Sequence, residues 1–485
     1  MTMSTTETDN RWAALIVLCV GFFMIVLDAT VVNVALPSIQ DELGFSQSSL
    51  AWVVNAYMIA FGGLLLLAGR LGDLLGRRRV FLAGLVVFTV ASMVCGVAQS
   101  QGMLVAARFL QGVGGAMSSA VILGMIVTMF PEPREQAKAI GIYGFVASGG
   151  GSAGLLAGGV LTDAINWHWI FFINVPIGIV TGLLALRMIP DDKGIGLREG
   201  ADAPGAALVT GGLMLGVYGI VGAAEHGWGA TRTLAIGAVS LALLVAFLMR
   251  QARIEKPLVP LRIFRSRSVS VANVVQVLSI AGMFGMFFLG ALYLQRILGY
   301  DPIEVGLAFL PTTLVMGVIS VRYSAPLAER FGPRRVILAG MTSILAGLAL
   351  FAPVPVDGGF ALNVLPSMLL MGAGAGAAFP AIVTLAMSAA TPQDAGLASG
   401  LVNTTAQVGG AIGLAVLATL STDRSDSLIA GGTATADALT QGYRLALIVA
   451  VALVAAAIGV VVAVLRRDPH PAALPAHAEP VCEPA

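Results

Sequence analysis

Long apolar stretches separated by short polar segments dominate the pattern along the chain. Each stretch approaches or exceeds the roughly 20 residues that a helix needs to cross the hydrocarbon core of a bilayer. Because the charged residues fall almost entirely between these stretches, the pattern predicts an all-α membrane fold with 14 transmembrane helices. Their approximate ranges are 12–36, 49–69, 80–99, 103–129, 138–161, 169–189, 204–222, 233–250, 269–294, 302–322, 335–353, 360–388, 397–420 and 442–465.

Composition excludes several classes of protein. Of the 485 residues, 57% are hydrophobic and 11% charged, against about 25% charged in soluble proteins. With a net charge of +1, we expect no nucleic-acid partner. We also expect no metal site, because the four histidines lie outside the apolar stretches and the cysteines Cys19, Cys95 and Cys482 form no CxxC pair.

The positions of Lys and Arg predict the orientation, since these residues concentrate in cytoplasmic loops. With the N-terminus in the cytoplasm, the outer loops hold only Arg232, Arg296, Arg424 and Arg444, and Arg108 lies inside a span. The first stretch is too long for a signal peptide and is expected to be retained. The sequence thus predicts a multi-pass protein of the inner or plasma membrane with both termini cytoplasmic.

An internal repeat predicts how the helices are grouped. Residues 69–84, GRLGDLLGRRRVFLAG, resemble residues 325–340, APLAERFGPRRVILAG, and Asp73 aligns with Glu329. Eight spans separate the copies, so we predict two six-helix halves related by a pseudo-two-fold axis, with two helices inserted between them. The expected parts are a cytoplasmic N-terminus 1–11, a first half 12–190, an insert 191–268, a second half 269–465 and a disordered cytoplasmic tail 466–485, with a long outer loop at 421–441.

Asp28, in LDATVVNVALP (27–37), is the only carboxylate clearly inside an apolar stretch. An ionisable group in a membrane span is expensive and is a candidate functional site by default. Arg108, in RFLQGVGGA (108–116), lies at a similar depth, so pairing directly or through Gln111 or water is expected. The simplest scheme has Asp28 exchange a proton for the cargo. Alternatively, Asp28 is structural and Arg108 only extends to the outer interface.

Two further motifs suggest moving parts. In the loop GRLGDLLGRRR (69–79), the gating candidates are Gly69, Asp73, Gly76, Arg77 and Arg78, whose charge pairs would break and reform as the halves rock. Simple anchoring on the positive side is the alternative. The fifth span is rich in glycine, which permits close helix approach and bending, although tight packing alone would also explain it.

Polar and aromatic residues inside the spans are few, and they are the candidates for lining a substrate cavity. Asn174 is also expected to be buried and to need a partner. The cavity candidates are Asn33, Trp52, Asn55, Tyr57, Gln111, Asn273, Gln276, Asn403 and Gln407.

These motifs together resemble the major facilitator superfamily, specifically its bacterial branch of fourteen-helix drug:proton antiporters, over residues 11–467. LDATVVNVALP resembles the branch's span-1 motif, GRLGDLLGRRR the loop 2–3 motif, and RFLQGVGGA the span-4 motif, in which Arg108 would be the proton-coupling arginine. The span-5 antiporter motif is matched in spacing by Gly141, Gly150, Gly154, Gly158 and Gly159. Leu155 replaces its usual proline, and His168 stands where the branch commonly has arginine.

The resemblance implies a major-facilitator fold, proton-driven export (antiport) of drugs by alternating access, and a central cavity between the halves. Because only one acid lies clearly inside the spans, we expect the drugs to be lipophilic and cationic or neutral. We also expect a monomer in the bilayer and no cofactor beyond the proton gradient. The alternative is a dedicated exporter of one endogenous metabolite, such as a self-made antibiotic. A membrane enzyme is disfavoured, because the sequence has no nucleotide loop and no Ser/His/Asp set inside the spans. A non-transporting sensor is disfavoured because no signalling domain is apparent.

Overall fold

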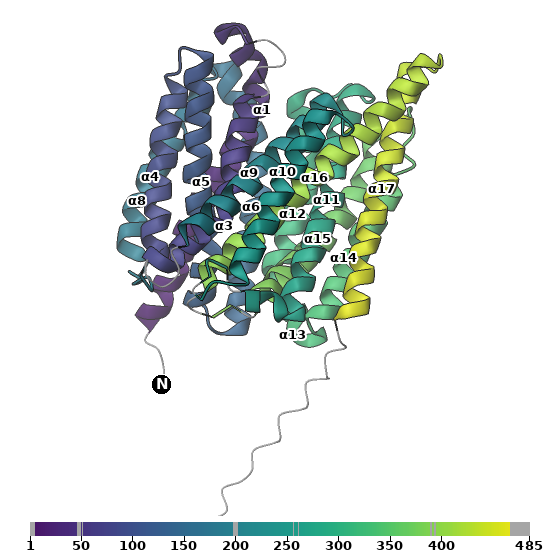
Figure 1. Cartoon of the computed structure of the whole chain (residues 1–485). Helices are drawn as coiled ribbons and strands as arrows, with labels where there is room; N and C mark the ends of the chain where they lie inside the picture. The colour runs from purple at the N-terminus through teal and green to yellow at the C-terminus, as the bar shows by residue number, and fades with distance from the viewer. Residues whose placement is uncertain are drawn as a thin grey trace, which may run out of the picture.

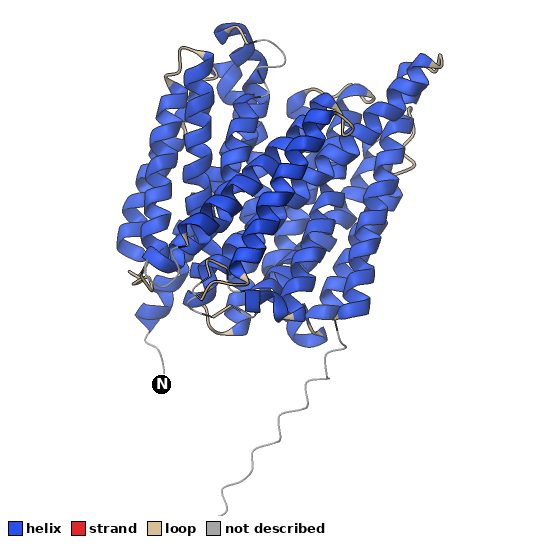
Figure 2. Ribbon diagram, in the orientation of Figure 1, coloured by secondary structure: helices blue, strands red, loops and turns tan. Residues whose placement is uncertain are grey.

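The computed structural model describes residues 5–45, 50, 52–196, 202–255, 257–259, 261–388, 390–391 and 394–465. The predicted tail 466–485 lies outside these residues. Within them, 14 helices are long and apolar enough to cross a membrane, as predicted. All the regular structure of the described chain is helical (Figure 2), as expected where backbone groups must be satisfied within each segment.

The helices follow one another in the order that hydropathy predicts, with short helical pieces added at several ends. They are α1 (Thr5–Leu43), α3 (Trp52–Leu75), α4 (Arg77–Gly96), α5 (Gln101–Met129), α6 (Pro133–Ala164), α7 (Trp169–Phe172), α8 (Asn174–Met188), α9 (Ala203–His226), α10 (Thr231–Gln251), η2 (Leu261–Arg265), α11 (Arg267–Arg296), α12 (Pro302–Val318), η3 (Ile319–Tyr323), α13 (Ser324–Phe331), α14 (Pro333–Phe351), η4 (Phe360–Val364), α15 (Leu365–Met387), α16 (Ala395–Ala430) and α17 (Thr435–Val464).

The segment expected to be a long outer loop at 421–441 is mostly helical. α16 continues to Ala430 and α17 begins at Thr435. The Ser425 hydroxyl lies within hydrogen-bonding distance of the carbonyls of Ser421 and Ala438, 2.8 and 3.3 Å away. The loop prediction was wrong because hydropathy detects only the part of a helix that is apolar enough for lipid, whereas a polar helical extension is stabilised by its neighbour.

The helices form two bundles that lie side by side (Figure 1). One contains α1 and α3–α8, the other α11–α17, and the inserted helices α9 and α10 lie in front of the junction. The start of α1 and the end of α17 lie at the same end of the molecule, which we call the basic end because Arg70, Arg77 and Arg334 lie there. The opposite end is the distal end.

The two copies of the repeat share their backbone geometry. Gly76 separates α3 from α4 with a φ of 100°, and Gly332 separates α13 from α14 with a φ of 80°. Both lie in the left-handed region that glycine adopts without strain. Each copy therefore has glycine at this position because the sharp turn between its two helices requires a left-handed backbone conformation.

The inserted pair lies at the edge of the molecule but contacts both halves. α9 packs on α3 and on α16, and α10 packs on α9. Asp202 caps α9 through the amide of Gly205 and pairs with Arg250 and Gln251 at the end of α10. Burial alone would raise the pKa of Asp202, but these hydrogen bonds outweigh it and hold the pKa below its usual value.

Candidate functional site: a buried ion pair beside a central cavity

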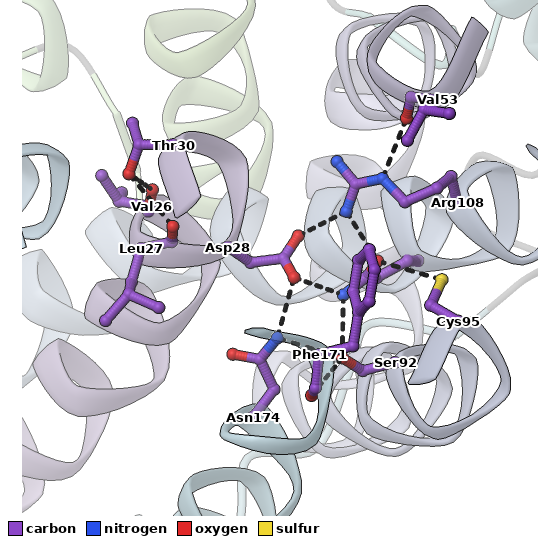
Figure 3. Close-up of polar contacts among 11 residues, drawn as sticks. Val26, Leu27, Asp28, Thr30, Val53, Ser92, Cys95, Arg108, Phe171 and Asn174 are labelled. Atoms are coloured by element: carbon purple, nitrogen blue, oxygen red, sulfur yellow. Dashed lines mark hydrogen bonds and ion pairs between the residues drawn. The ribbon is translucent and has the colours of Figure 1, made fainter. Parts of the chain in front are cut away.

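Asp28 of α1 lies at the centre of a polar network inside the first bundle (Figure 3). Its Oδ2 accepts a hydrogen bond from Arg108 Nη1 at 2.6 Å. Its Oδ1 accepts from the side-chain amides of Gln111 and Asn174 at 2.7 and 2.8 Å. Asp28 is 0% and Arg108 1% exposed, so the pairing that matched depth indicated is present as a fully buried contact.

A second layer of polar groups holds the two amides in place. The Ser92 hydroxyl of α4 accepts hydrogen bonds from Gln111 and Asn174 and donates to the carbonyl of Phe171 at 2.9 Å. That carbonyl lies at the end of the short helix α7, where the predicted sixth span is divided into α7 and α8. Asn174 thus has the partner that its burial required, whereas Ser92 could not be singled out among the small residues of its helix.

Arg108 is held from two further sides. Its Nε donates to the carbonyl of Val53 at 3.0 Å, and the ring of Tyr57 lies over the guanidinium, 4.4 Å from its centre. Both partners belong to α3. A cation against the face of a buried aromatic ring is stabilised by about 0.5–2 kcal/mol. The arrangement excludes the alternative in which Arg108 extends to the outer interface.

A cavity of about 430 Å³ lies between the two bundles. Thr30 of α1 lines it, two residues after Asp28. Successive helical residues turn by about 100°, so Thr30 and Asp28 lie on opposite sides of α1, as Figure 3 shows. Asp28 and Arg108 are not among the lining residues, and Tyr57, which is, separates Arg108 from the cavity.

Of the nine predicted cavity residues, the described lining contains Tyr57, Gln276, Asn403 and Gln407. The other described candidates lie outside this lining. The side-chain amide of Gln111 donates a hydrogen bond to Asp28 instead. Asn273 donates to Val269 O and accepts from Thr405.

Trp52 is 39% exposed and lies against Tyr218 of α9. Asn55 is half-buried in α3, away from the described lining. The side chain of Asn33 lies outside the described part of the chain.

Asp73, at the end of α3, joins the two bundles at the basic end. Its two carboxylate oxygens accept hydrogen bonds from the backbone amides of Gly396 and Leu397, both at 2.8 Å, at the start of α16. Arg77 pairs with the same carboxylate at 2.9 Å. A buried carboxylate at the N-terminus of a helix is stabilised by unpaired amides and the helix dipole, so Asp73 stabilises contact between the halves here.

The other gating candidates surround this contact. A side chain at Gly69 would collide with the backbone of Gly396. The backbone amides of Arg77 and Arg78 donate to the Asp192 carboxylate, at 2.7 and 3.0 Å. A side chain at Gly76 would collide with the backbone carbonyl of the same aspartate.

Asp394 forms a second link between the bundles at the basic end. It lies near Arg70 of α3, at 3.8 Å, and pairs with Arg262 of η2 at 2.6 Å. Sequence reasoning missed both Asp192 and Asp394, because loop carboxylates at a charged membrane surface give no signal until their partners are known.

The glycines of α6 divide into two groups. A side chain at Gly141 would lie 2.5 Å from the carbonyl of Ser320 in the second bundle, whereas Gly150 and Gly154 face Val26 and Thr30 of α1 within the first. Gly158 and Gly159 are buried near the distal end of the helix. The side chain of Leu155 lies outside the described residues.

Two hydrogen bonds cross between the bundles at mid-depth. The hydroxyls of Ser152 and Thr313 lie 2.9 Å apart. The Tyr143 hydroxyl donates to Asn403 at 3.2 Å. These contacts, together with that of Gly141, align α6 with the second half.

At the distal end, Glu42 ties α1 to the segment before α8. It accepts from Trp167 Nε1 at 2.8 Å and lies 3.1 Å from His168 Nε2. His168, which departs from the family pattern, thus contacts the Glu42 carboxylate there. Within the described ranges, no group of three His, Cys, Asp or Glu side chains is placed to hold a metal ion.

Comparison with known proteins agrees with this arrangement. Residues 18–414 match the family model described as Major Facilitator Superfamily. The chain is 40% identical over 448 residues to the puromycin resistance protein pur8 of Streptomyces alboniger, covering 91% of this chain and 89% of that protein. It is 39% identical over 420 residues to the cephamycin export protein CmcT of Amycolatopsis lactamdurans, covering 86% of each.

The fold is similar to that of a solved human organic anion transporter, MFSD10, with a TM-score of 0.61 at 15% identity, covering 92% of this chain and 99% of that one. At that identity the likeness concerns the fold alone. The family match and the two bacterial relatives show that this chain belongs to the major facilitator superfamily.

Proposed function

We propose that this protein exports lipophilic, cationic or neutral drugs or antibiotics from the cell in exchange for protons. The basic end faces the cytoplasm, with both termini there, which the bias of Lys and Arg supports. In that orientation the contacts of Asp73 and Gly141 join the halves on the cytoplasmic side. The protein works as a monomer, with no cofactor other than the proton gradient.

The observation that carries the proposal is a buried carboxylate, Asp28, neutralised by one buried arginine and two amides. Protonating Asp28 would remove the partner of Arg108 and leave an uncompensated buried charge. The network would then rearrange, which changes the relative stability of the two conformations. Proton and substrate couple when they bias that one equilibrium in opposite senses.

The position of Asp28 revises the simplest scheme, in which cargo and proton exchange at one carboxyl group. Because Asp28 is fully buried and is not among the residues that line the cavity, a ligand in the cavity does not contact it directly. Coupling therefore acts through shared elements, α1 and α3, which contribute residues to both sites. Tyr57 is the side chain that contacts Arg108 and also lines the cavity.

A dedicated exporter of one endogenous metabolite is the second candidate, supported by the name of the cephamycin export relative. A resistance panel of dyes, quaternary ammonium compounds, puromycin and cephamycins distinguishes the two. Deletion and overexpression strains would be compared with and without an uncoupler. Protection against many classes supports drug export, and protection against one compound supports the dedicated exporter.

Asp28→Asn in inverted membrane vesicles tests the coupling role. We expect proton-driven uptake of any compound identified by the panel to fall to background, because the amide cannot take up the transported proton. Asp426→Asn, which changes an exposed carboxylate on α16, is the control and should transport normally. Wild-type uptake by the Asp28 variant would show that coupling occurs elsewhere.

A further inference from the structure

We propose that the central cavity binds an uncharged, flat amphiphile, and that its exchange for a proton therefore moves net charge across the membrane. The proposal about the ligand rests on the cavity lining, and the proposal about charge rests also on the antiport function proposed above.

No charged side chain is present among the described residues that line the cavity. The buried ion pair of Asp28 with Arg108 is internally neutralised at 2.6 Å, and Tyr57 lies between it and the cavity. A cation entering this space would lose water without gaining an opposite charge, which is unfavourable. Tyr57 gives little compensation, because its ring already interacts with Arg108, and the other rings of the wall offer only the weaker attraction of a quadrupole.

Aromatic rings form much of the cavity wall. Phe22 stacks on Tyr143 with ring centres 4.3 Å apart, and Tyr57 stacks on Phe61 at 5.6 Å. Phe284, Phe287 and Phe379 complete the wall from the second half. Offset stacking on such rings favours a flat ligand with a π-system.

Two residues of the wall each have a buried polar atom with no hydrogen-bond partner among the described residues. Gln276 donates its amide to the carbonyl of Val402, but its Oε1 is unpaired. The hydroxyl of Tyr57 is also unpaired. Both residues are 4% exposed. Since buried polar groups are almost always satisfied, a ligand with an N–H or O–H for Gln276 and an acceptor for Tyr57 would satisfy both atoms once these side chains turn toward it.

The ligand's charge determines what drives export. If one proton enters for each uncharged molecule that leaves, each cycle carries one positive charge inward. The membrane potential then contributes about 2.3 kcal/mol per 100 mV, equivalent to about a 50-fold concentration ratio. If a monocation left instead, the exchange would be electroneutral and only the pH gradient would drive it.

Acridone and 9-aminoacridine test the ligand class, because they share a flat tricyclic shape but only 9-aminoacridine is protonated at neutral pH. Acridone also has one N–H and one carbonyl. With the purified full-length protein, we expect acridone to bind at least about tenfold more tightly in a fluorescence titration, since an unpaired charge is disfavoured in the cavity. Equal or tighter binding of 9-aminoacridine, or no binding of acridone, overturns the proposal.

Two variants of Gln276 give the titration an internal control. Gln276→Leu removes the acceptor and should weaken acridone binding about fivefold, as expected for one hydrogen bond. Gln276→Glu keeps the acceptor and adds a negative charge, so it should reverse the preference in favour of 9-aminoacridine. An unchanged preference in the glutamate variant would show that the ligands bind elsewhere.

Proteoliposomes separate this proposal from the antiport function. A lumen-positive potassium–valinomycin potential without a pH gradient should drive acridone uptake, relative to protein-free liposomes. If acridone is preferred in binding but neither potential nor pH gradient drives its uptake, the cavity inference holds and the antiport proposal fails. If a pH gradient drives uptake but the potential does not, the antiport proposal holds and the charge-moving step is wrong.

Discussion

Tyr57 contacts two sites that the sequence does not connect. Its ring lies over Arg108, and the same residue forms part of the cavity wall. At the scale of the residue, it is therefore a direct side-chain link from a bound ligand to the buried ion pair. Asp28 and Thr30 lie on one turn of α1 but belong to different sites, since Asp28 pairs with Arg108 and Thr30 lines the cavity.

Two substitutions of Tyr57 should distinguish the contribution of its ring to proton coupling from that of its hydroxyl. Tyr57→Phe keeps the ring over Arg108 and should retain proton-coupled transport. Tyr57→Leu removes a contact worth about 0.5–2 kcal/mol and should lower the ratio of substrate moved to protons moved. Proteoliposomes with a pH-sensitive dye and a measured substrate flux give that ratio.

Phe61→Leu is the matched control for Tyr57→Leu. Phe61 also lines the cavity and stacks on Tyr57, so its loss should weaken ligand binding while the coupling ratio stays near wild type. An equal loss of coupling in the two leucine variants would assign the effect to general packing.

At the scale of the element, the two copies of the repeat make related but unequal contacts with the opposite half. Asp73 accepts from the start of α16 and its side chain is 0% exposed, whereas Glu329 lies 3.6 Å from Arg134 near the start of α6 and is 47% exposed. Exposed ion pairs contribute about 0–1 kcal/mol. The first copy therefore contributes more to the contact between the halves at the basic end.

Asp73→Asn should reduce turnover while leaving substrate affinity nearly intact, because Asp73 lies at the closure contact and outside the described cavity lining. Its carboxylate interacts with unpaired amides at a helix N-terminus, an effect of up to about 2 kcal/mol. Initial transport rates and a binding titration measure the two quantities. Glu329→Gln should change turnover much less, and unchanged turnover in Asp73→Asn would reduce this loop to a determinant of topology.

At the scale of the whole molecule, the described contacts between the bundles favour the conformation in which the halves touch at the basic end. Gly141 allows α6 to approach the backbone of Ser320, and Gly69 allows α3 to approach Gly396. Since each position lacks space for a Cβ, added volume would separate the halves and favour the conformation open at the basic end.

Gly141→Ala should shift that equilibrium, because its Cβ would lie 2.5 Å from the carbonyl oxygen of Ser320. Gly149→Ala, on the same helix, is the control, since the described residues leave its added Cβ without a neighbour within 4 Å. Hydrogen exchange at the start of α16, where the amides of Gly396 and Leu397 bind Asp73, should be faster in the first variant only. Equal protection in both would contradict the role of Gly141.

Hydropathy was sufficient to predict the helices, and matched depth in the membrane indicated the pairing of Asp28 with Arg108 that the structure contains. These features depend on properties local to each segment: its length, its apolar character and the high energy of a charge in lipid. The same reasoning failed at 421–441, where helices extend beyond their apolar part.

Which way each side chain faces was decided only by the tertiary structure. A membrane helix is apolar on its lipid-facing and its protein-facing sides, so the periodicity that identifies the buried face of a soluble helix is weak. Asp28 could therefore not be assigned to the side opposite the cavity, nor Gln111 and Asn273 to internal hydrogen bonds. Asp394 became informative only once packing placed it beside Arg70 and Arg262. Residue type and spacing determine which polar groups must be buried away from lipid, and helix packing determines which of these groups contact one another.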